Sequence, residues 1–263
     1  MERREFLAAS SLTGAAAWAA WSGEASAEEL QRELYELRIY EMPGGSRKNL
    51  LQDYLSKAAI PAWNRLGVKP VGAFNVVLGA NSQELFLLLP FPSLEAFLTA
   101  PTKMAADADY QKAAAEYLGV PIENPSFLRY QSSLLLAFQQ VPRLRLPAQT
   151  AENKPRIFEL RTYESHSEKA ALKKIEMFNE GGEIGIFDRV GLKAVFFGQR
   201  LIGPRQPNLV YLTVHDDMAG RDKTWDVFRN DPEWKKLSAD PAYANTVSAS
   251  TIVFLRPASF SQI

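Results

Sequence analysis

Two short segments of the chain carry the same alternation of glutamate, arginine and tyrosine, with each residue two positions from the next. The six residues are Glu36, Arg38, Tyr40, Glu159, Arg161 and Tyr163. Arginine binds carboxylate and carbonyl oxygens, while glutamate or tyrosine can transfer a proton. We therefore take all six residues as candidates for ligand binding, and the last three also as candidates for catalysis.

A spacing of two residues is the period of a β-strand, so each set of three lies on one face of a strand. The opposite face of the first strand carries Tyr35, Leu37 and Ile39. Because helices pack against the more apolar face of a sheet, we expect the charged rows to point away from the helices, into the interior of the fold. There they would form either a polar ligand cavity or a set of Glu–Arg ion pairs that fix the register between two sheets.

The sequence offers few other groups for chemistry. It has no cysteine, which excludes thiolate catalysis and thiolate metal sites, and its two histidines are His166 and His215. His215 ends a predicted strand beside Asp216 and Asp217, and neighbours on a strand point to opposite faces, so these side chains would not gather around one metal ion. Both histidines lie at strand ends or in loops, which disfavours an axial haem ligand. We predict no metal site and no cofactor.

Signatures of other function classes are absent from the sequence. There is no Gly-x-Ser-x-Gly elbow and no glycine-rich phosphate loop. Lysine plus arginine equals aspartate plus glutamate, at 30 each, and no basic run is long enough to follow a phosphate backbone. We expect no nucleic-acid partner. Four aromatic residues recur at helical spacing and are expected in the core: Trp63, Trp225, Phe228 and Trp234.

The chain contains an internal duplication. The aligned pairs are 34–41 with 157–164, 65–69 with 189–193, and 107–112 with 231–236. The last two pairs share one offset without a gap, which indicates two copies of one unit.

Hydrophobic periodicity predicts the order strand, helix, strand, strand, helix, strand in each copy. In the first copy the strands are 35–40, 71–78, 85–89 and 132–138, and the helices are 47–66 and 93–117. In the second copy the strands are 156–164, 193–200, 208–214 and 248–256, and the helices are 167–190 and 218–237. We expect interruptions at Pro61, near Pro101, and at Gly181 and Gly182.

This order is that of the ferredoxin-like unit, an antiparallel sheet with both helices on one face. The other face would be left bare in water. We therefore predict an α+β protein in which two tandem ferredoxin-like (βαββαβ) units pack sheet to sheet as an intrachain α/β barrel. The units are residues 28–140 and 156–263, joined by a proline-containing linker at 141–155.

The N-terminus has the features of an export signal. Arg3 and Arg4 precede Phe6 and a moderately apolar stretch at 8–21, and the small residues at 25–27 suit a signal peptidase. The apolar stretch is too short and too polar to span a membrane stably. We predict a twin-arginine signal peptide at 1–27, export to the periplasm, and no stable membrane span after cleavage.

Four sequence elements resemble the NIPSNAP family: Tyr-Glu-Leu-Arg-Ile-Tyr (35–40), Phe-Glu-Leu-Arg-Thr-Tyr (158–163), Asp-Pro-Glu-Trp (231–234) and Leu-Arg-Pro-Ala-Ser-Phe-Ser (255–261). The resemblance covers essentially all of the predicted mature chain and implies the dimeric α/β-barrel fold. Related barrels include cofactor-free monooxygenases and haem enzymes, whereas animal members resemble mitochondrial proteins of trafficking and quality control, so the fold does not select a chemistry. The first copy departs from the family pattern at 107–110, which favours a site in the second copy.

These observations predict an exported module that binds a small organic ligand or acts as a scaffold for a protein partner. The alternative is a cofactor-independent enzyme of the barrel monooxygenase type, in which Arg161 polarises a substrate oxygen and Glu159 or Tyr163 accepts a proton. A third hypothesis is a structural homo-oligomer with a filled interior and an extended apolar patch outside.

Overall fold

The structure is a computed structural model that describes residues 32–43, 48–79 and 83–263. The predicted signal peptide at 1–27 lies outside the described residues. Within the described ranges, no helix has the length and apolarity that crossing a membrane requires.

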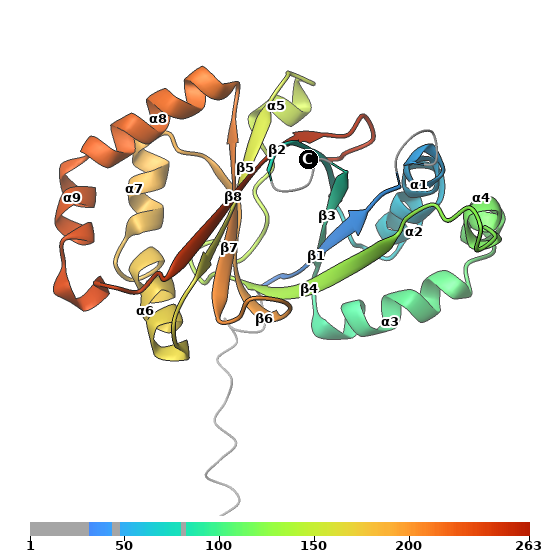
Figure 1. The fold of residues 1–263 in the computed structure, drawn as a ribbon, viewed down its shortest axis with the longest axis horizontal. Helices are drawn as coiled ribbons and strands as arrows, with labels where there is room; N and C mark the ends of the chain where they lie inside the picture. Colours follow the sequence, from blue (N-terminus) through green and yellow to red (C-terminus); the bar gives the residue numbers. More distant parts are fainter. Residues whose placement is uncertain (1–31, 44–47, 80–82) are drawn as a thin grey trace, which may run out of the picture. The chain divides into compact units, whose positions relative to one another are not determined.

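Eight strands in this part of the chain close into one antiparallel barrel (Figure 1). They are β1 (Leu34–Glu41), β2 (Gly72–Leu78), β3 (Glu84–Phe91), β4 (Arg129–Ala137), β5 (Ile157–Glu164), β6 (Ala194–Ile202), β7 (Asn208–His215) and β8 (Ala249–Pro257). Their order around the barrel is β1-β3-β2-β8-β5-β7-β6-β4, so each half of the chain contributes four adjacent strands in the same relative order. The halves join at two seams, β2 with β8 and β4 with β6. The predicted barrel within a single chain is confirmed.

Helices cover the outside of the barrel in two groups, one per half of the chain (Figure 1). The first group is α1 (Lys48–Tyr54), a π-helical turn (Leu55–Ala59), α2 (Ile60–Arg65), α3 (Leu94–Ala105) and α4 (Ala108–Leu118). The second group is α6 (Glu168–Phe178), α7 (Glu183–Val190), α8 (Met218–Asn230) and α9 (Pro232–Ser238). The short α5 (Ala148–Ala151) lies in the link between the halves, and a 3-10 turn (Pro241–Tyr243) precedes β8.

Side chains that accept backbone hydrogen bonds begin five of these helices. They are Ser93 for α3, Asp107 for α4, Ser167 for α6, Asp217 for α8 and Asp231 for α9. The sequence predicts an interruption near Pro101, but α3 continues through this proline and the break comes where Asp107 caps the next helix. The predicted break at the glycine pair is present: Gly182 has φ 88° and separates α6 from α7.

One ion pair recurs at the same position in both halves. Arg65, at the end of α2, donates to Asp107, and Arg189, at the end of α7, donates to Asp231. Each aspartate also caps the helix that it begins, so one carboxylate ties the end of an earlier helix to the start of a later one.

Apolar side chains fill the interior of the barrel. Phe74 of β2 and Phe158 of β5 meet edge to face with ring centroids 4.9 Å apart, and Tyr35 lies 5.1 Å from Phe196. Leu37 belongs to the same buried cluster. An eight-stranded barrel is just wide enough for side chains to fill, so this cluster occupies the centre of the barrel.

The predicted direction of the Glu-Arg-Tyr rows is therefore wrong. Because their neighbours on β1 and β5 occupy the interior, the charged rows lie on the outer face of the barrel, beneath the helices. The guanidinium of Arg38 lies 5.5 Å from the ring centre of Trp63 in α2, and the indole of Trp225 in α8 donates to Glu159 at 2.8 Å. The rule that helices cover the apolar face fails here because the helices themselves supply polar and aromatic partners for the charged rows.

Replacing Phe158 by alanine tests the packing of the interior. The side chain is fully buried, so F158A should lower the free energy of unfolding by about 3–5 kcal/mol, as measured by urea denaturation. The control is Leu172→Ala on α6, where the side chain is 56% exposed and the change should stay within about 0.5 kcal/mol. A loss smaller than about 1 kcal/mol for F158A would contradict a packed interior.

Candidate functional site

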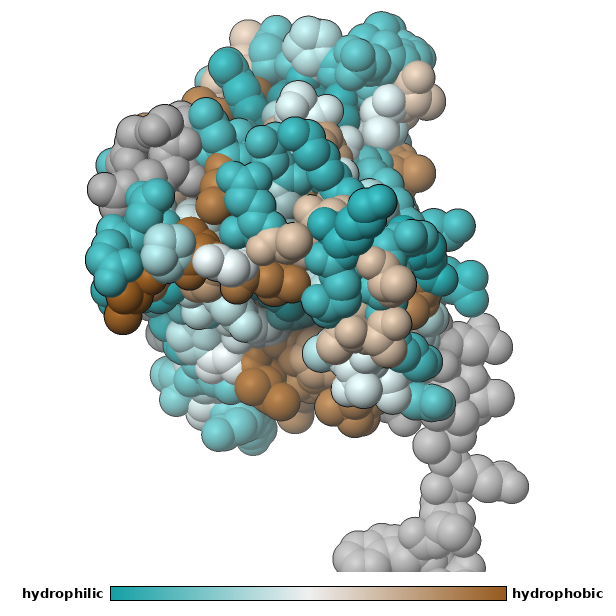
Figure 2. Space-filling view, turned by 90° about the vertical axis from the view of Figure 1, so that its right-hand side faces the viewer, coloured by the Kyte–Doolittle hydropathy of each residue, from teal (hydrophilic) through white to brown (hydrophobic). Residues whose placement is uncertain are grey.

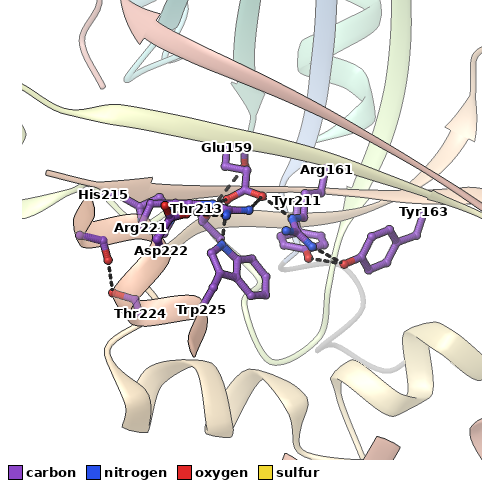
Figure 3. A network of polar contacts seen from close by, with 11 residues as sticks. Glu159, Arg161, Tyr163, Tyr211, Thr213, His215, Arg221, Asp222, Thr224 and Trp225 are labelled. Carbon is purple, nitrogen blue, oxygen red and sulfur yellow. Dashed lines mark hydrogen bonds and ion pairs between the residues drawn. The ribbon is translucent and has the colours of Figure 1, made fainter. Parts of the chain in front are cut away.

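The carboxylate of Glu159 is the centre of a polar cluster in the second half (Figure 3). This side chain is fully buried between β5 and α8. It accepts hydrogen bonds from Arg161 Nε at 2.6 Å, from Arg221 Nε at 2.8 Å and Nη2 at 2.9 Å, and from Trp225 Nε1 at 2.8 Å. Four donors therefore surround two carboxylate oxygens.

The position of α8 explains why two of these donors converge. Asp217 begins the helix by accepting the backbone N–H of Gly220. Arg221 and Trp225 are four residues apart, so they lie on the same face of the helix, and this face is turned to the sheet. The guanidinium of Arg161 also lies 3.9 Å above the Trp225 ring, which adds a cation–π contact.

The electrostatics of this cluster keep Glu159 ionised. Burial alone would raise the pKa of Glu159. The hydrogen bonds from Arg221, Arg161 and Trp225 and the charge of Arg161 outweigh burial, so the pKa is lowered from its ordinary value. A closed, fully paired carboxylate has no lone pair left for a substrate. This arrangement favours the ion-pair alternative over a ligand cavity in the second half.

The cluster extends along β5 to the phenol of Tyr163. Arg161 Nη1 donates to the Tyr163 hydroxyl at 2.9 Å, and this hydroxyl lies 2.8 Å from that of Tyr211 on β7. Burial, together with the neighbouring phenol of Tyr163, raises the pKa of Tyr211 well above its ordinary value, so Tyr211 is a neutral phenol. Lys174 and Glu183 form a second buried ion pair nearby, at 2.7 Å.

His215 lies at the other end of the cluster. It is 5% exposed, its Nε2 is 3.0 Å from the Thr213 hydroxyl, and the same atom is 3.8 Å from Glu159. Burial lowers the pKa of His215 to about 4. The carboxylate of Glu159 acts to raise this pKa, whereas the positive charges of Arg221 and Arg161 act to lower it. The imidazole is therefore neutral at pH 7, and its contact with Glu159 is not an ion pair there.

In the first half, the equivalent glutamate is paired with fewer donors. Arg38 Nε and Nη2 donate to Glu36 at 2.8 and 3.0 Å, and the hydroxyl of Ser132 on β4 donates to it at 2.7 Å. Arg38 Nη1 donates to the Tyr40 hydroxyl at 3.1 Å. Burial opposes the charge of Arg38, but Glu36 and Tyr40 outweigh it, so the pKa of Arg38 is raised above its ordinary value. The arginine remains a cation.

A cavity of about 490 Å³ opens above this pair, between the sheet and the helices. Its lining is Glu36, Arg38, Tyr54, Trp63, Phe91, Phe97, Leu98, Ala100, Pro101, Met104, Ala105, Tyr110, Gln111, Leu118 and Tyr130. Trp63 and Tyr130 flank the guanidinium of Arg38, whose side chain remains 19% exposed. Figure 2 looks onto the side of the first-half helices and shows hydrophobic side chains gathered on its lower part. Leu98 and Leu118 line the cavity and are among the exposed apolar residues.

A sequence difference between the copies accounts for the opening. At the offset that aligns Asp107 with Asp231, Arg221 and Trp225 correspond to Phe97 and Pro101. Neither of these side chains donates a hydrogen bond, so α3 brings no polar partner down to Glu36. The space that Arg221 and Trp225 fill in the second half is cavity in the first half.

Phenols also line the cavity, among them those of Tyr54 and Tyr110. The hydroxyls of Tyr54 and Tyr110 are 3.0 Å apart, and Tyr54 stacks on Tyr117 with ring centroids 3.6 Å apart. Burial, followed by the hydrogen bond to Tyr110, raises the pKa of Tyr54, and burial also raises that of Tyr117. These groups are neutral polar contacts at ordinary pH and not bases.

The structure brings the six predicted residues together as two separate groups of three, one per half. Sequence reasoning placed Trp225 in the core, where it is 4% exposed, but did not assign it a hydrogen-bonding role. It also missed Arg221 and the cavity phenols. The spacing of four between Arg221 and Trp225 on a predicted helix was the available signal. Among the described residues no group of three or more histidines, aspartates or glutamates is arranged to hold a metal ion.

Acid should destabilise the protein through His215. Between its ordinary pKa of 6.5 and its folded pKa of about 4, only the unfolded chain takes up the proton, so stability falls as the pH falls. From pH 7 to pH 5 the loss due to this residue is about 2 kcal/mol. Urea unfolding of H215Q at these two pH values should show a correspondingly smaller loss.

The exposed His166 provides the matched control. H166Q should keep the pH dependence of the wild type. Stopping at pH 5 keeps Glu159 ionised, because its pKa lies below its ordinary range. Equal pH dependence in H215Q and the wild type would show that His215 is not held neutral by burial.

Comparison with solved structures identifies proteins of the same fold. Two of them, from Lactobacillus acidophilus and Fusobacterium nucleatum, are each described as a "putative monooxygenase". Both are 10% identical to this chain and cover 86% of it, with 94% and 92% of their own chains matched and TM-scores of 0.57 and 0.52. An uncharacterised NIPSNAP-like domain protein from Burkholderia xenovorans is 23% identical over 40% of this chain and 88% of its own, with a TM-score of 0.36.

Sequence comparison gives the family. No curated protein matches the chain. The NIPSNAP family profile matches twice, at residues 35–127 and 158–262, once in each half of the barrel. The two matches include both Glu-Arg-Tyr rows, the Glu159 cluster and the lining of the first-half cavity except Tyr130. Together they span most of the chain, so the protein belongs to the NIPSNAP family.

Proposed function

We propose that the first half of the protein binds a small organic molecule in the cavity above Glu36 and Arg38. The observation that carries this proposal is that Arg38, a cation, retains exposed surface inside a cavity of about 490 Å³ lined largely by aromatic and apolar side chains. Ligand sites are commonly apolar cavities of this size with a few polar groups that orient the ligand.

The donors that remain on Arg38 define the ligand. Nε and Nη2 donate to Glu36 and Nη1 to Tyr40, which leaves one N–H on each terminal nitrogen. Two such N–H groups suit a carboxylate, a sulfonate or a carbonyl oxygen. The flanking rings of Trp63 and Tyr130 suit a flat apolar body. The ligand is therefore an aromatic or largely apolar molecule with one oxyanion or carbonyl group.

The second half has a different role in this proposal. Its Glu159 cluster is closed and satisfied, so it holds α8 on the sheet and serves as a scaffold. Catalytic roles for Glu159, Arg161 and Tyr163 would require a path to Glu159, whose side chain has no exposed surface.

A cofactor-independent oxygenase is the second candidate. Its support is the likeness in fold to the two proteins described as putative monooxygenases. In such an enzyme the substrate would occupy the first-half cavity, where Arg38 would bind a substrate oxygen and Glu36 would accept a proton. This places the predicted chemistry on the first Glu-Arg-Tyr row instead of the second.

We also infer that the two halves are tandem ferredoxin-like units that arose by duplication, at residues 28–140 and 156–263 with a linker at 141–155. The identical strand order of the halves and the recurring Arg–Asp pair support this inference. For the N-terminus we propose a cleaved twin-arginine signal at 1–27 and a periplasmic location, on the sequence pattern alone.

Ligand binding is tested by native mass spectrometry of the mature protein from an exporting host, followed by titration with the fluorescent probe 8-anilinonaphthalene-1-sulfonate, an aromatic anion. Arg38→Gln should weaken probe binding by about tenfold, because it removes a charged donor pair. Arg161→Gln is the matched variant of the other row and should leave the affinity unchanged in the folded protein. Loss of binding in R161Q alone would contradict the proposal.

A cavity-filling pair controls for probe binding elsewhere. Ala100 is 4% exposed and lines the cavity, so A100F should also block the probe. Leu94 lies on the same helix but is 51% exposed and outside the lining, so L94F should have no effect. If A100F and L94F bind the probe equally, the probe does not occupy this cavity. Turnover of a bound native molecule that is lost in R38Q would favour the oxygenase.

Export is tested by replacing both N-terminal arginines with lysine. The twin-arginine pathway reads the arginine pair, so R3K/R4K should retain the protein in the cytoplasm of a Gram-negative host, as judged by fractionation. The exposed Arg129→Lys variant is the control and should be exported normally. Unchanged periplasmic recovery of R3K/R4K would contradict a twin-arginine signal.

A further inference from the structure

One end of the barrel interior holds a second cavity, of about 200 Å³, which the proposed function does not use. Its lining is Leu37, Ile39, Glu84, Phe86, Gln131, Ser133, Leu160, Thr162, Arg200, Pro204, Arg205, Thr251 and Val253. The apolar members of this set continue the packed interior, and the polar members form a ring at the mouth. This cavity lies on the opposite face of β1 from Arg38, because Leu37 and Ile39 line it.

Arg200 is the group in this cavity that lacks a counter-charge. The residue is 7% exposed and lies on β6. Its Nη1 donates to the backbone oxygen of Pro204 at 2.7 Å, whereas its buried Nε has no hydrogen-bond partner. Among the described residues Arg200 forms no ion pair. A buried arginine is normally paired with a carboxylate, because an uncompensated charge in the interior is costly.

The backbone around Arg200 holds the side chain in place. Gly203 has φ 145°, and a Cβ at this position would lie 2.6 Å from Ser133 Oγ and 2.9 Å from Arg200 Cδ. Only glycine fits this conformation without displacing the arginine. Gln206 donates to the backbone oxygen of Arg200 at 3.1 Å and fixes the same turn.

Arg200 has charged neighbours of both signs at the mouth of this cavity. Arg205 is the second arginine of the lining, and its exposed side chain reaches Glu164 at 3.7 Å. Burial, followed by the charge of Arg205, lowers the pKa of Arg200 to about 10, against the opposing effect of Glu164. Arg200 is still a cation at pH 7. Glu84 is the one carboxylate of the lining.

We propose that the mouth of the barrel binds the oxyanion group of a small molecule, a carboxylate or a phosphate, between Arg200 and Arg205. The unpartnered Nε and the adjacent Nη2 of Arg200 form the planar fork that matches such a group. The hydroxyls of Ser133, Thr162 and Thr251 supply neutral hydrogen bonds at the same mouth. The volume of about 200 Å³ equals that of roughly seven water molecules, which limits the ligand to a small anion.

The test is isothermal titration calorimetry of the mature protein with inorganic phosphate and, separately, with acetate, at constant ionic strength set by sodium chloride. The wild type should bind at least one of the two with one site per chain. Arg200→Gln should raise the dissociation constant by at least about tenfold. Arg205→Gln should raise it a few-fold, because Arg205 is largely exposed and contributes a screened charge.

Arg145→Gln is the matched control, because it removes one exposed arginine near the other end of β6, where the Arg145 backbone meets Val195. It should leave the affinity unchanged. If R200Q does not fold, the R205Q and R145Q pair still decides the matter. Absence of saturable binding by the wild type would overturn the proposal. Equal affinities in R205Q and R145Q would also overturn it, provided that R200Q, where it folds, has that same affinity. Binding of phosphate but not acetate would identify a tetrahedral anion as the ligand, and the reverse would identify a carboxylate.

Discussion

The narrow interior of the closed barrel is the constraint on which the rest of the structure depends. Eight strands leave space for side chains and little else, and this space is taken by a cluster that includes Phe74, Phe158 and Phe196. Every second residue of each strand must then face outward. The glutamate, arginine and tyrosine of β1 and β5 fall on this outer face, so their charges have to be compensated in the layer between the sheet and the helices.

The two halves meet this requirement in different ways. In the second half α8 brings Arg221 and Trp225 onto Glu159, and the carboxylate is buried with all its hydrogen bonds made. In the first half α3 carries Phe97 and Pro101 at those positions, and Glu36 relies on neighbours in its own sheet. The result is a rigid, filled site in one half and a cavity with a partly exposed arginine in the other. At these two aligned positions α8 carries two hydrogen-bond donors and α3 carries none.

The sequence predicted the elements of the fold but not which face of each strand is buried. Periodicity and the internal repeat located the strands and the barrel, since both depend on short-range pattern. The direction of the Glu-Arg-Tyr rows was wrong because it rested on apolarity alone. Partners such as Arg221 lie about sixty residues from Glu159, and single-sequence patterns do not reveal such pairs. The helix break was predicted near Pro101 but lies at Asp107, because the side chain of Asp107 caps the next helix. This capping aspartate is visible in the sequence once both halves are aligned.

Covalent linkage of the two halves allows the barrel to be asymmetric. If the two halves were identical subunits, the seams β2–β8 and β4–β6 would be related by a twofold axis, and every side chain would appear twice. A buried arginine such as Arg200 would then have a copy of itself at the same end of the interior, because equivalent residues such as Ile39 and Thr162 line one cavity. In this chain the residue aligned with Arg200 at the shared offset is Val76, which packs against the apolar cluster. A single polypeptide can therefore charge one side of this barrel end and keep the equivalent position on the other side apolar, an arrangement that a symmetric pair of subunits does not permit.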